Sequence, residues 1–115
     1  MSQPLRISAR IPSLTAVRYF SVAARLLSFT GAAQELHVTQ AAVSRMVQTL
    51  EQDLGVALFQ RSGKFIRLTP AGLAYYQEVS EALARILEAS QTARRSAQEE
   101  TLSLIVNTGF AIRWL

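Results

Sequence analysis

The stretch that decides the fold is TQAAVSRMVQTLEQDLG, residues 39–55. Wound as a helix at about 100° per residue, it gathers its apolar side chains within one arc of roughly 100°. These side chains are Val43, Met46, Val47, Leu50 and Leu54. Thr39 can cap the helix by accepting a backbone amide hydrogen bond, and Gly55 supplies the left-handed residue that ends it. The pattern therefore predicts a helix that is buried along one side.

The other face of this predicted helix is rich in amides and hydroxyls and carries little charge. Its members are Gln40, Ala41, Ser44, Arg45, Gln48 and Gln52. Gln and Arg side chains can pair with base edges in the major groove of DNA, which makes such a face suitable for reading sequence. A solvated amphipathic helix would present a similar pattern, so the helix alone leaves both interpretations open.

Basic side chains are concentrated in the first part of the chain. The net charge is +4, and no acidic residue precedes Glu35. Residues 1–70 carry eight basic and three acidic side chains, whereas residues 71–115 carry four and five. This distribution suggests a polyanionic partner for the first part, although solubility alone would also account for it.

Composition excludes several classes of protein. The chain has 115 residues, enough for one small domain and an extension but not for a large core around an active-site cleft. It has no cysteine, and its single histidine, His37, has no second histidine with which to complete a metal site. We find no paired nucleophile and base and no glycine-rich phosphate loop, so we expect neither an enzyme nor a bound cofactor. No apolar run is long enough to cross a membrane, and a cytoplasmic location is expected; the acid-poor N-terminus resembles a transit peptide only superficially.

Two further helices are predicted before residue 39. Residues 1–12 form a tail without periodicity, and a helix capped by Ser13 runs to about Leu27. Its predicted apolar stripe consists of Leu14, Val17, Phe20, Val22, Ala24 and Leu27. A short helix capped by Thr30 follows, with Ala32, Ala33 and Leu36 inside, and His37 and Val38 then form a tight turn. A short helix, a turn and a longer helix predict a helix-turn-helix at about residues 30–49.

A basic hairpin is predicted at about residues 57–68. Strand-like segments at 57–61 and 65–68 flank a Ser62-Gly63-Lys64 turn. We expect the hairpin to lean on the helices through its apolar side chains, Leu58, Phe59, Ile66 and Leu68. Near its tip lie the cations Arg61, Lys64 and Arg67, which after a helix-turn-helix would form a wing that contacts phosphates. The alternative is a structural hairpin whose basic residues are incidental.

A long helix is predicted next, over residues 70–99, with Thr69 as its cap and Pro70 at its first position. A heptad seam with spacings of three and four runs along it through Tyr76, Val79, Leu83, Ile86, Ser90, Ala93 and Ala97. The expected partner of this seam is the same helix of a second copy. Leu73 and Tyr75 lie off the seam, and we expect them to pack on the N-terminal helices.

The pattern changes again in residues 100–115. Residues 101–106 read as a strand, residues 107–109 as a turn and residues 110–115 as the start of a helix. We interpret this segment as the truncated start of a second domain.

Residues 28–72 resemble a known family of proteins; their sequence is SFTGAAQELHVTQAAVSRMVQTLEQDLGVALFQRSGKFIRLTPAG. This run resembles the N-terminal DNA-binding domain of LysR-type transcriptional regulators, and the resemblance extends over about residues 13–99. It implies a mainly α winged helix-turn-helix, with three helices and a hairpin wing, followed by a linker helix that forms a homodimer. The implied partner is double-stranded DNA with an interrupted palindromic operator, and full-length members can form tetramers. The segments FAIRWL and IPSLTAVRYFSVAARLLSF resemble the branch that includes the glycine-cleavage regulator.

Site residues follow from the resemblance position by position. Those at the start of the recognition helix are Gln40, Ala41, Ser44 and Arg45; those at helix N-termini that can hold phosphates are Thr30 and Thr39; and Arg61 is the wing arginine. For base reading we select Gln40, Ser44, Arg45 and Gln48, with backbone contact alone as the alternative for Arg45 and Gln48. Two departures are Ala41 in place of a common proline and Gly31 in place of a frequent basic residue.

A different class of function is also open, namely a coiled-coil dimer whose small helical head binds protein and not DNA. Such a head would be expected to expose apolar anchors. The polar face of residues 39–54 and the basic hairpin therefore favour DNA binding, and the family resemblance implies a bacterial transcription regulator in the cytoplasm, associated with the nucleoid.

Overall fold

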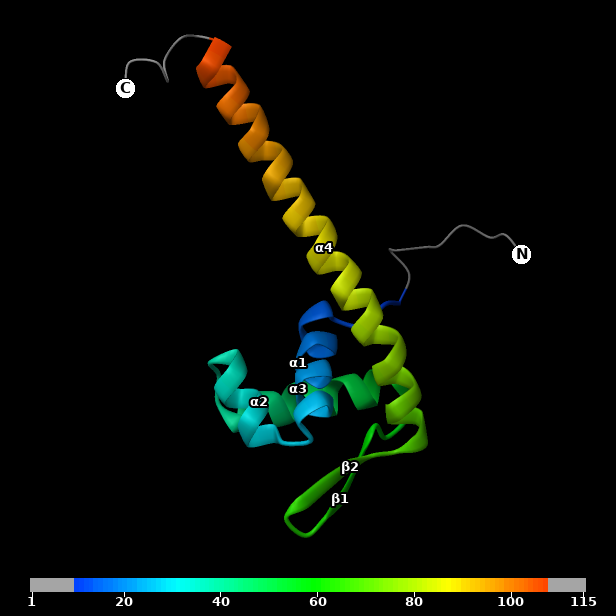
Figure 1. The fold of residues 1–115 in the computed structure, drawn as a ribbon. Coiled ribbons are helices and arrows are strands. Elements are labelled where there is room, and N and C mark those ends of the chain that lie inside the picture. Colours follow the sequence, from blue (N-terminus) through cyan, green and yellow to red (C-terminus); the bar gives the residue numbers. More distant parts are fainter. Residues whose placement is uncertain (1–9, 108–115) are drawn as a thin grey trace, which may run out of the picture. The chain divides into compact units, whose positions relative to one another are not determined.

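The computed structural model describes residues 10–107. They form three helices, a two-stranded hairpin and then one long helix (Figure 1). In chain order the elements are α1 (Leu14–Leu26), α2 (Phe29–Leu36), α3 (Gln40–Leu54), β1 (Phe59–Ser62), β2 (Phe65–Leu68) and α4 (Pro70–Asn107). The predicted mainly α class, with three helices, a hairpin and a long helix, is confirmed. The chain divides into two compact units, residues 1–80 and residues 81–115.

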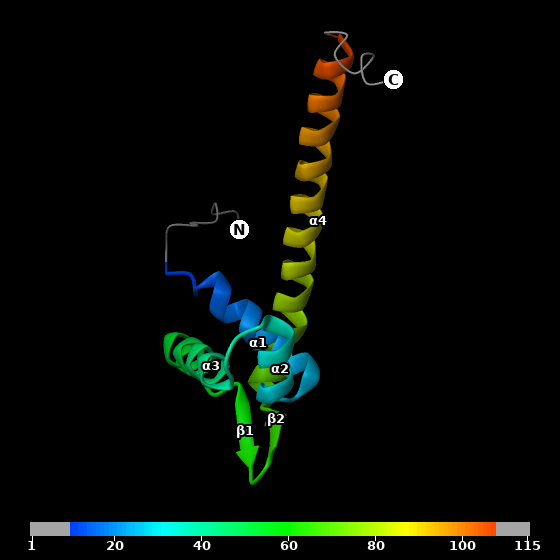
Figure 2. The same ribbon diagram turned by 90° about the vertical axis from the view of Figure 1, so that its left-hand side faces the viewer.

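The first unit is built on three helices packed around aromatic side chains. Phe20 of α1 is fully buried, and its ring centroid lies 5.4 Å from that of Phe59 and 5.6 Å from that of Tyr75. Val43, Val47 and Leu50 form the buried side of α3, as the periodicity predicted, while Met46 and Leu54 of the predicted stripe are half-buried. The turn between α2 and α3 is formed by residues 37–39, and it completes the predicted helix-turn-helix (Figure 2).

The buried stripe of α1 differs from the prediction at both ends. Leu14 is 56% exposed and Leu27 is 50% exposed, so neither belongs to the core. Leu14 is the first residue of the helix, and Leu27 lies beyond its end as a left-handed cap with φ of 50°. Val17, Phe20 and Ala24 are buried as predicted, together with Ala16 and Ala23, whereas Val22 is only half-buried. Alanines on this stripe allow the neighbouring helices to approach closely.

Helix α2 begins two residues earlier than predicted, because Ser28 and not Thr30 is its N-cap. The Ser28 hydroxyl accepts a hydrogen bond from the Gly31 amide at 2.8 Å. Phe29 is part of the helix because its ring must be buried: it packs edge-on against the Phe59 ring, with the two ring centroids 5.3 Å apart. At the other end of α2, His37 is the C-cap and takes a left-handed conformation with φ of 59°, at the start of the turn that the sequence predicts for His37 and Val38.

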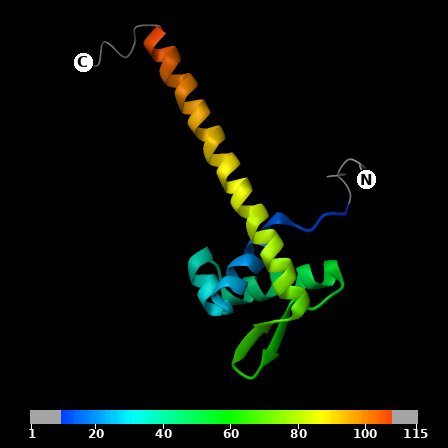
Figure 3. The ribbon, with the colours of Figure 1, turned by 45° about the vertical axis from the view of Figure 1, so that its right-hand side comes forward.

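The hairpin projects away from the helices (Figure 3). The residues at its base are hydrogen-bonded to α3 and to the start of α4. Phe59 pairs with Leu68 and Ser62 pairs with Phe65, so the turn consists of Gly63 and Lys64 alone. Leu58 and Phe59 are buried, while Ile66 and Leu68 are half-buried. The predicted first strand starts two residues too early, because the backbone at 57 and 58 is used for contacts with α3 and with residue 69.

Leu58 is held by three other parts of the first unit. Its amide donates to the Glu51 carboxylate of α3 at 2.8 Å, and its carbonyl accepts from the Thr69 amide at 3.0 Å. A Cβ built on Gly72 would lie 2.0 Å from the same carbonyl oxygen, so only glycine fits there. The first turn of α4 therefore packs directly against the backbone that leads into β1.

Helix α4 starts as predicted, with Thr69 as its cap and Pro70 at its first position. The Thr69 hydroxyl accepts from the Gly72 amide at 2.9 Å. Tyr75 packs on α1 as expected, and burial, with a smaller effect from the negative charge of Asp53, raises its phenol pKa. The same expectation was wrong for Leu73, which is 48% exposed, since two residues that are two positions apart on a helix lie on nearly opposite sides of it.

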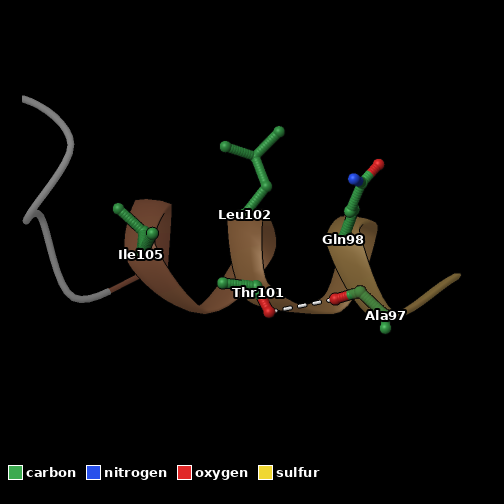
Figure 4. Close-up of a pocket in the computed structure, with 5 residues that line it drawn as sticks. All are labelled: Ala97, Gln98, Thr101, Leu102 and Ile105. Carbon is green, nitrogen blue, oxygen red and sulfur yellow. Dashed lines mark hydrogen bonds between the residues drawn. The ribbon is translucent and has the colours of Figure 1, made fainter. Parts of the chain in front are cut away.

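The strand predicted at residues 101–106 is wrong, since α4 continues as a helix to Asn107. The Thr101 hydroxyl bonds the Ala97 carbonyl at 3.0 Å, as in a continuing helix, and Figure 4 shows this section. A strand needs a neighbouring strand to satisfy its backbone, whereas a helix satisfies its own. The only strands among residues 10–107 are the two of the hairpin, which pair with each other. The remainder of the predicted turn and the helix after it lie outside the described residues.

No helix within residues 10–107 is long and apolar enough to cross a membrane.

The contact between Gly72 and Leu58 generates a stability prediction. Gly72→Ala should destabilise the first unit by about 1–3 kcal/mol or more, because the new methyl group overlaps a backbone oxygen that cannot rotate away. Urea unfolding followed by circular dichroism measures the change. Gly31→Ala is the matched control: its nearest neighbour is the Ser28 hydroxyl oxygen, 3.2 Å from the added Cβ, and we expect only a small change. Equal unfolding midpoints for the two variants would contradict the assigned role of Gly72.

Candidate nucleic-acid interface

The outer face of α3 carries the side chains that the sequence selects for base reading. Gln40, Ala41, Arg45 and Gln48 are exposed, and Ser44 is half-buried. The opposite side of the helix is buried in the core, where Val43 and Val47 lie. The polar side chains are thus presented on a helix that is fixed from behind, which is the arrangement that sequence reading requires.

Thr39 lies at the N-terminus of α3, where its hydroxyl accepts the Ala42 amide at 3.0 Å. This bond confirms Thr39 as the cap. The side chain is exposed, and its hydroxyl proton remains available to a partner in front of the helix.

A cleft of about 240 Å³ lies where the starts of α2 and α3 meet the hairpin. It brings together four of the predicted site residues, Thr30, Gln40, Arg61 and Lys64. The complete lining is Leu27, Ser28, Phe29, Thr30, Gln40, Arg61, Gly63, Lys64 and Ile66. This lining contains two cations and no carboxylate, so the cleft suits an anion.

Thr30 has a different role from the cap that the sequence predicted. Its hydroxyl donates to Gln40 Oε1 at 3.1 Å and so links the start of α2 to the start of α3. The Gln40 amide nitrogen is then left to donate outward.

Arg61 is held by groups from both helices. Its guanidinium carbon lies 4.8 Å from the centroid of the Phe29 ring, in a cation–π contact. Its Nη2 donates to the Ser44 hydroxyl at 3.4 Å. Arg61 therefore connects the hairpin to α2 and α3 at once.

Arg67 lies apart from the other two hairpin cations. In the antiparallel register Arg61 faces Ile66, whereas Arg67 faces Gln60. Since neighbouring residues of a strand point to opposite faces, Arg67 lies on the face away from the cleft. Phe65 shares that outer face and is 74% exposed.

Sequence reasoning missed the parts played by Phe29 and Ser28. An aromatic residue directly before a predicted N-cap indicates a side chain that packs in the core, and Phe29 does pack there. Its second contact, with Arg61, joins positions 32 residues apart, so no local pattern could indicate it. The signal for Ser28 was available, because serine is as good an N-cap as threonine and lies three residues before Gly31.

Within residues 10–107 no group of three or more His, Cys, Asp or Glu side chains could hold a metal ion.

A helix-turn-helix followed by a cationic hairpin defines the class of winged helix-turn-helix proteins. Comparison with known families then identifies the chain more closely. The model described as "Bacterial regulatory helix-turn-helix protein, lysR family" matches residues 14–73, and the chain belongs to this family.

The relatives of the chain are transcriptional regulators. The glycine cleavage system transcriptional activator of Escherichia coli K12 is 41% identical over 109 residues, which are 95% of this chain and 36% of that protein. The chain thus spans about a third of the length of this relative. The match to this relative confirms the resemblance to the glycine-cleavage-regulator branch.

Two solved structures with a similar fold contain DNA. The complex of the BenM DBD with catB site 1 DNA has a TM-score of 0.70 and 33% identity, and covers 74% of this chain and 94% of that one. The CbnR DBD–DNA complex has a TM-score of 0.66 and 34% identity, and covers 74% and 98% of the two chains.

Proposed function

We propose that this chain binds double-stranded DNA sequence-specifically as a homodimer and is the DNA-binding part of a LysR-type transcriptional regulator. The observation that carries the proposal is the anion-suited cleft directly beside the polar face of α3. The two similar structures that contain DNA support it. Such a regulator would act in the cytoplasm, on the nucleoid.

The proposed roles divide between base edges and backbone. Gln40, Arg45 and Gln48 of α3 read bases in the major groove, and Ala41 offers a methyl group for apolar contact. The backbone contacts come from Thr30, Thr39, Arg61, Lys64 and Arg67. The hairpin supplies most of the positive charge, so it contributes affinity that does not depend on sequence.

Dimerisation is proposed to use the seam along α4. The seam consists of Tyr76, Val79, Leu83, Ile86, Ser90, Ala93 and Ala97, all of which lie on the observed helix. Ile86 is 46% exposed, so the single chain leaves it open to a partner. Two copies related by a two-fold axis would read two half-sites, as in an interrupted palindrome.

We assign no cofactor to this chain. A small-molecule effector is proposed to bind the part of such a regulator that the chain does not span. A tetramer, if the full-length regulator forms one, would also involve that part.

The proposal is tested by fluorescence anisotropy of the chain on a labelled random-sequence duplex at two salt concentrations. Binding should be tight at low salt and fall steeply as salt rises, because counterions are released from the phosphates. Selection from a random duplex library would then give the half-site. A folded, dimeric chain that fails to bind at low salt would contradict DNA binding and favour the protein-interaction module.

Arg45→Ala should weaken binding to the selected site by about 1–3 kcal/mol and relax the preference at one base position. The expected loss is confined to that position because Arg45 is proposed to contact a base edge. Competition binding with duplexes carrying single-base substitutions measures the effect. A uniform loss on all duplexes would show that Arg45 contacts only the backbone.

Lys64→Ala should weaken binding to all sequences alike and reduce the salt slope by about 1, since Lys64 lines the cleft. Arg67→Ala removes the same charge from the outer face of the hairpin and serves as the matched control. We expect a smaller loss for Arg67→Ala in the same salt titration. Equal losses would mean that the cleft has no special role in binding phosphate.

Leu83→Asp combined with Ile86→Asp should shift the chain from dimer to monomer, because each copy would bury two carboxylates in the seam. Sedimentation velocity measures the assembly state, and anisotropy should show weaker DNA binding at the same time. The control is Ala84→Asp, which adds a charge to α4 off the seam. A double variant that remains dimeric would place the dimer interface elsewhere.

A further inference from the structure

Three elements of the first unit converge on one side chain, Arg61. The residue itself comes from β1, the ring below its guanidinium is Phe29 of α2, and the hydroxyl beside it is Ser44 of α3. The guanidinium also lines the cleft that contains Lys64. Among the cations of the described chain, this one is oriented by two side chains outside its own strand.

The two contacts restrict different motions of the arginine. The cation–π contact with the Phe29 ring limits the direction in which the side chain leaves the strand. The Ser44 hydroxyl accepts an edge N–H and limits rotation in the plane. Together they hold a long, otherwise flexible side chain near one orientation before any ligand arrives.

Orientation of this kind changes affinity without adding a contact to the ligand. A free arginine loses several rotamers when it binds a phosphate, and that entropy loss weakens binding. An arginine that is already fixed loses less, and its remaining N–H groups can face the phosphate as a pair.

Phe29 is well placed for such a role because it is itself immobile. It is 7% exposed, and its ring packs edge-on against Phe59, two residues before Arg61 on the same face of β1. The residue that supports the guanidinium and the strand that carries it are thus parts of one packed cluster.

We propose that Ser44 and Phe29 are positioning residues for DNA binding, which act through Arg61 by holding its guanidinium ready for a backbone phosphate. The inference rests on the proposed DNA binding. It changes the expectation for Ser44, which the sequence selected as a base reader. In this proposal the Ser44 oxygen acts by accepting the Arg61 N–H, so Ser44 contributes to affinity for every sequence and does not select a base.

A double-mutant cycle on the full chain tests the inference. The variants are Ser44→Ala, Arg61→Ala and the combination of the two, measured by anisotropy on the selected duplex and on single-base variants of it. Ser44→Ala should lower affinity about threefold to tenfold on all duplexes alike and make the salt dependence shallower. In the Arg61→Ala background it should cause no further loss, because the side chain that it positions is gone.

The matched control removes a hydroxyl elsewhere on the same helix. Thr49→Ala deletes a group that bonds the Arg45 carbonyl within α3, and we expect it to leave affinity unchanged. Phe29→Leu is a second arm that keeps an apolar side chain and removes the ring. The loss of DNA affinity that Phe29→Leu causes should likewise vanish in the Arg61→Ala background. Thermal unfolding is measured alongside, because Phe29 is buried.

The outcomes separate this inference from the proposed function. Wild-type chain that does not bind DNA at low salt overturns both. Wild-type binding with equal Ser44→Ala losses in the presence and absence of Arg61 overturns the positioning role alone. So does a Ser44→Ala variant that changes the preference at one base position and keeps its affinity for the other duplexes. If Phe29→Leu fails to fold, the Ser44 cycle alone decides.

Discussion

The contact on which the first unit depends is the approach of Gly72 to the backbone of Leu58. The missing side chain at 72 lets α4 begin against a carbonyl oxygen that an alanine Cβ would meet at 2.0 Å. The same peptide segment is held by the Glu51 carboxylate of α3 and by the Thr69 amide. Helix α3, the hairpin and the start of α4 are therefore joined at one buried residue, and the direction of the hairpin follows from it.

The direction of the hairpin in turn decides which cations meet the helices. Phe59 must point inward to fill the core between Phe20 and Phe29. A strand repeats its direction every second residue, so Arg61 points to the same side and reaches Phe29 and Ser44, while Arg67 does not. The position of the charge is thus a consequence of core packing.

The elements that sequence reasoning located correctly are those whose signals are local. The caps at Thr39 and Thr69, the stop at Gly55 and the buried stripe of α3 depend on neighbours within a turn or two of helix. Errors arose where distant residues matter. Phe29, which packs against Phe59, is the first residue of α2, so the N-cap is Ser28 and not Thr30. Residues 101–106, which were predicted as a strand, continue α4 as a helix, which satisfies its own backbone without a partner strand.

The sequence by itself determined the class of fold, the helix with its polar face and the identity of the candidate DNA-contacting residues, because periodicity, capping and charge are properties of short segments. Only the tertiary structure decided how those residues are grouped. It placed Thr30 on Gln40, Arg61 on Phe29 and Ser44, and Arg67 on the opposite face. Each of these placements joins positions that lie far apart along the chain, and a side chain's partner at that distance is set by the packing of the core between them.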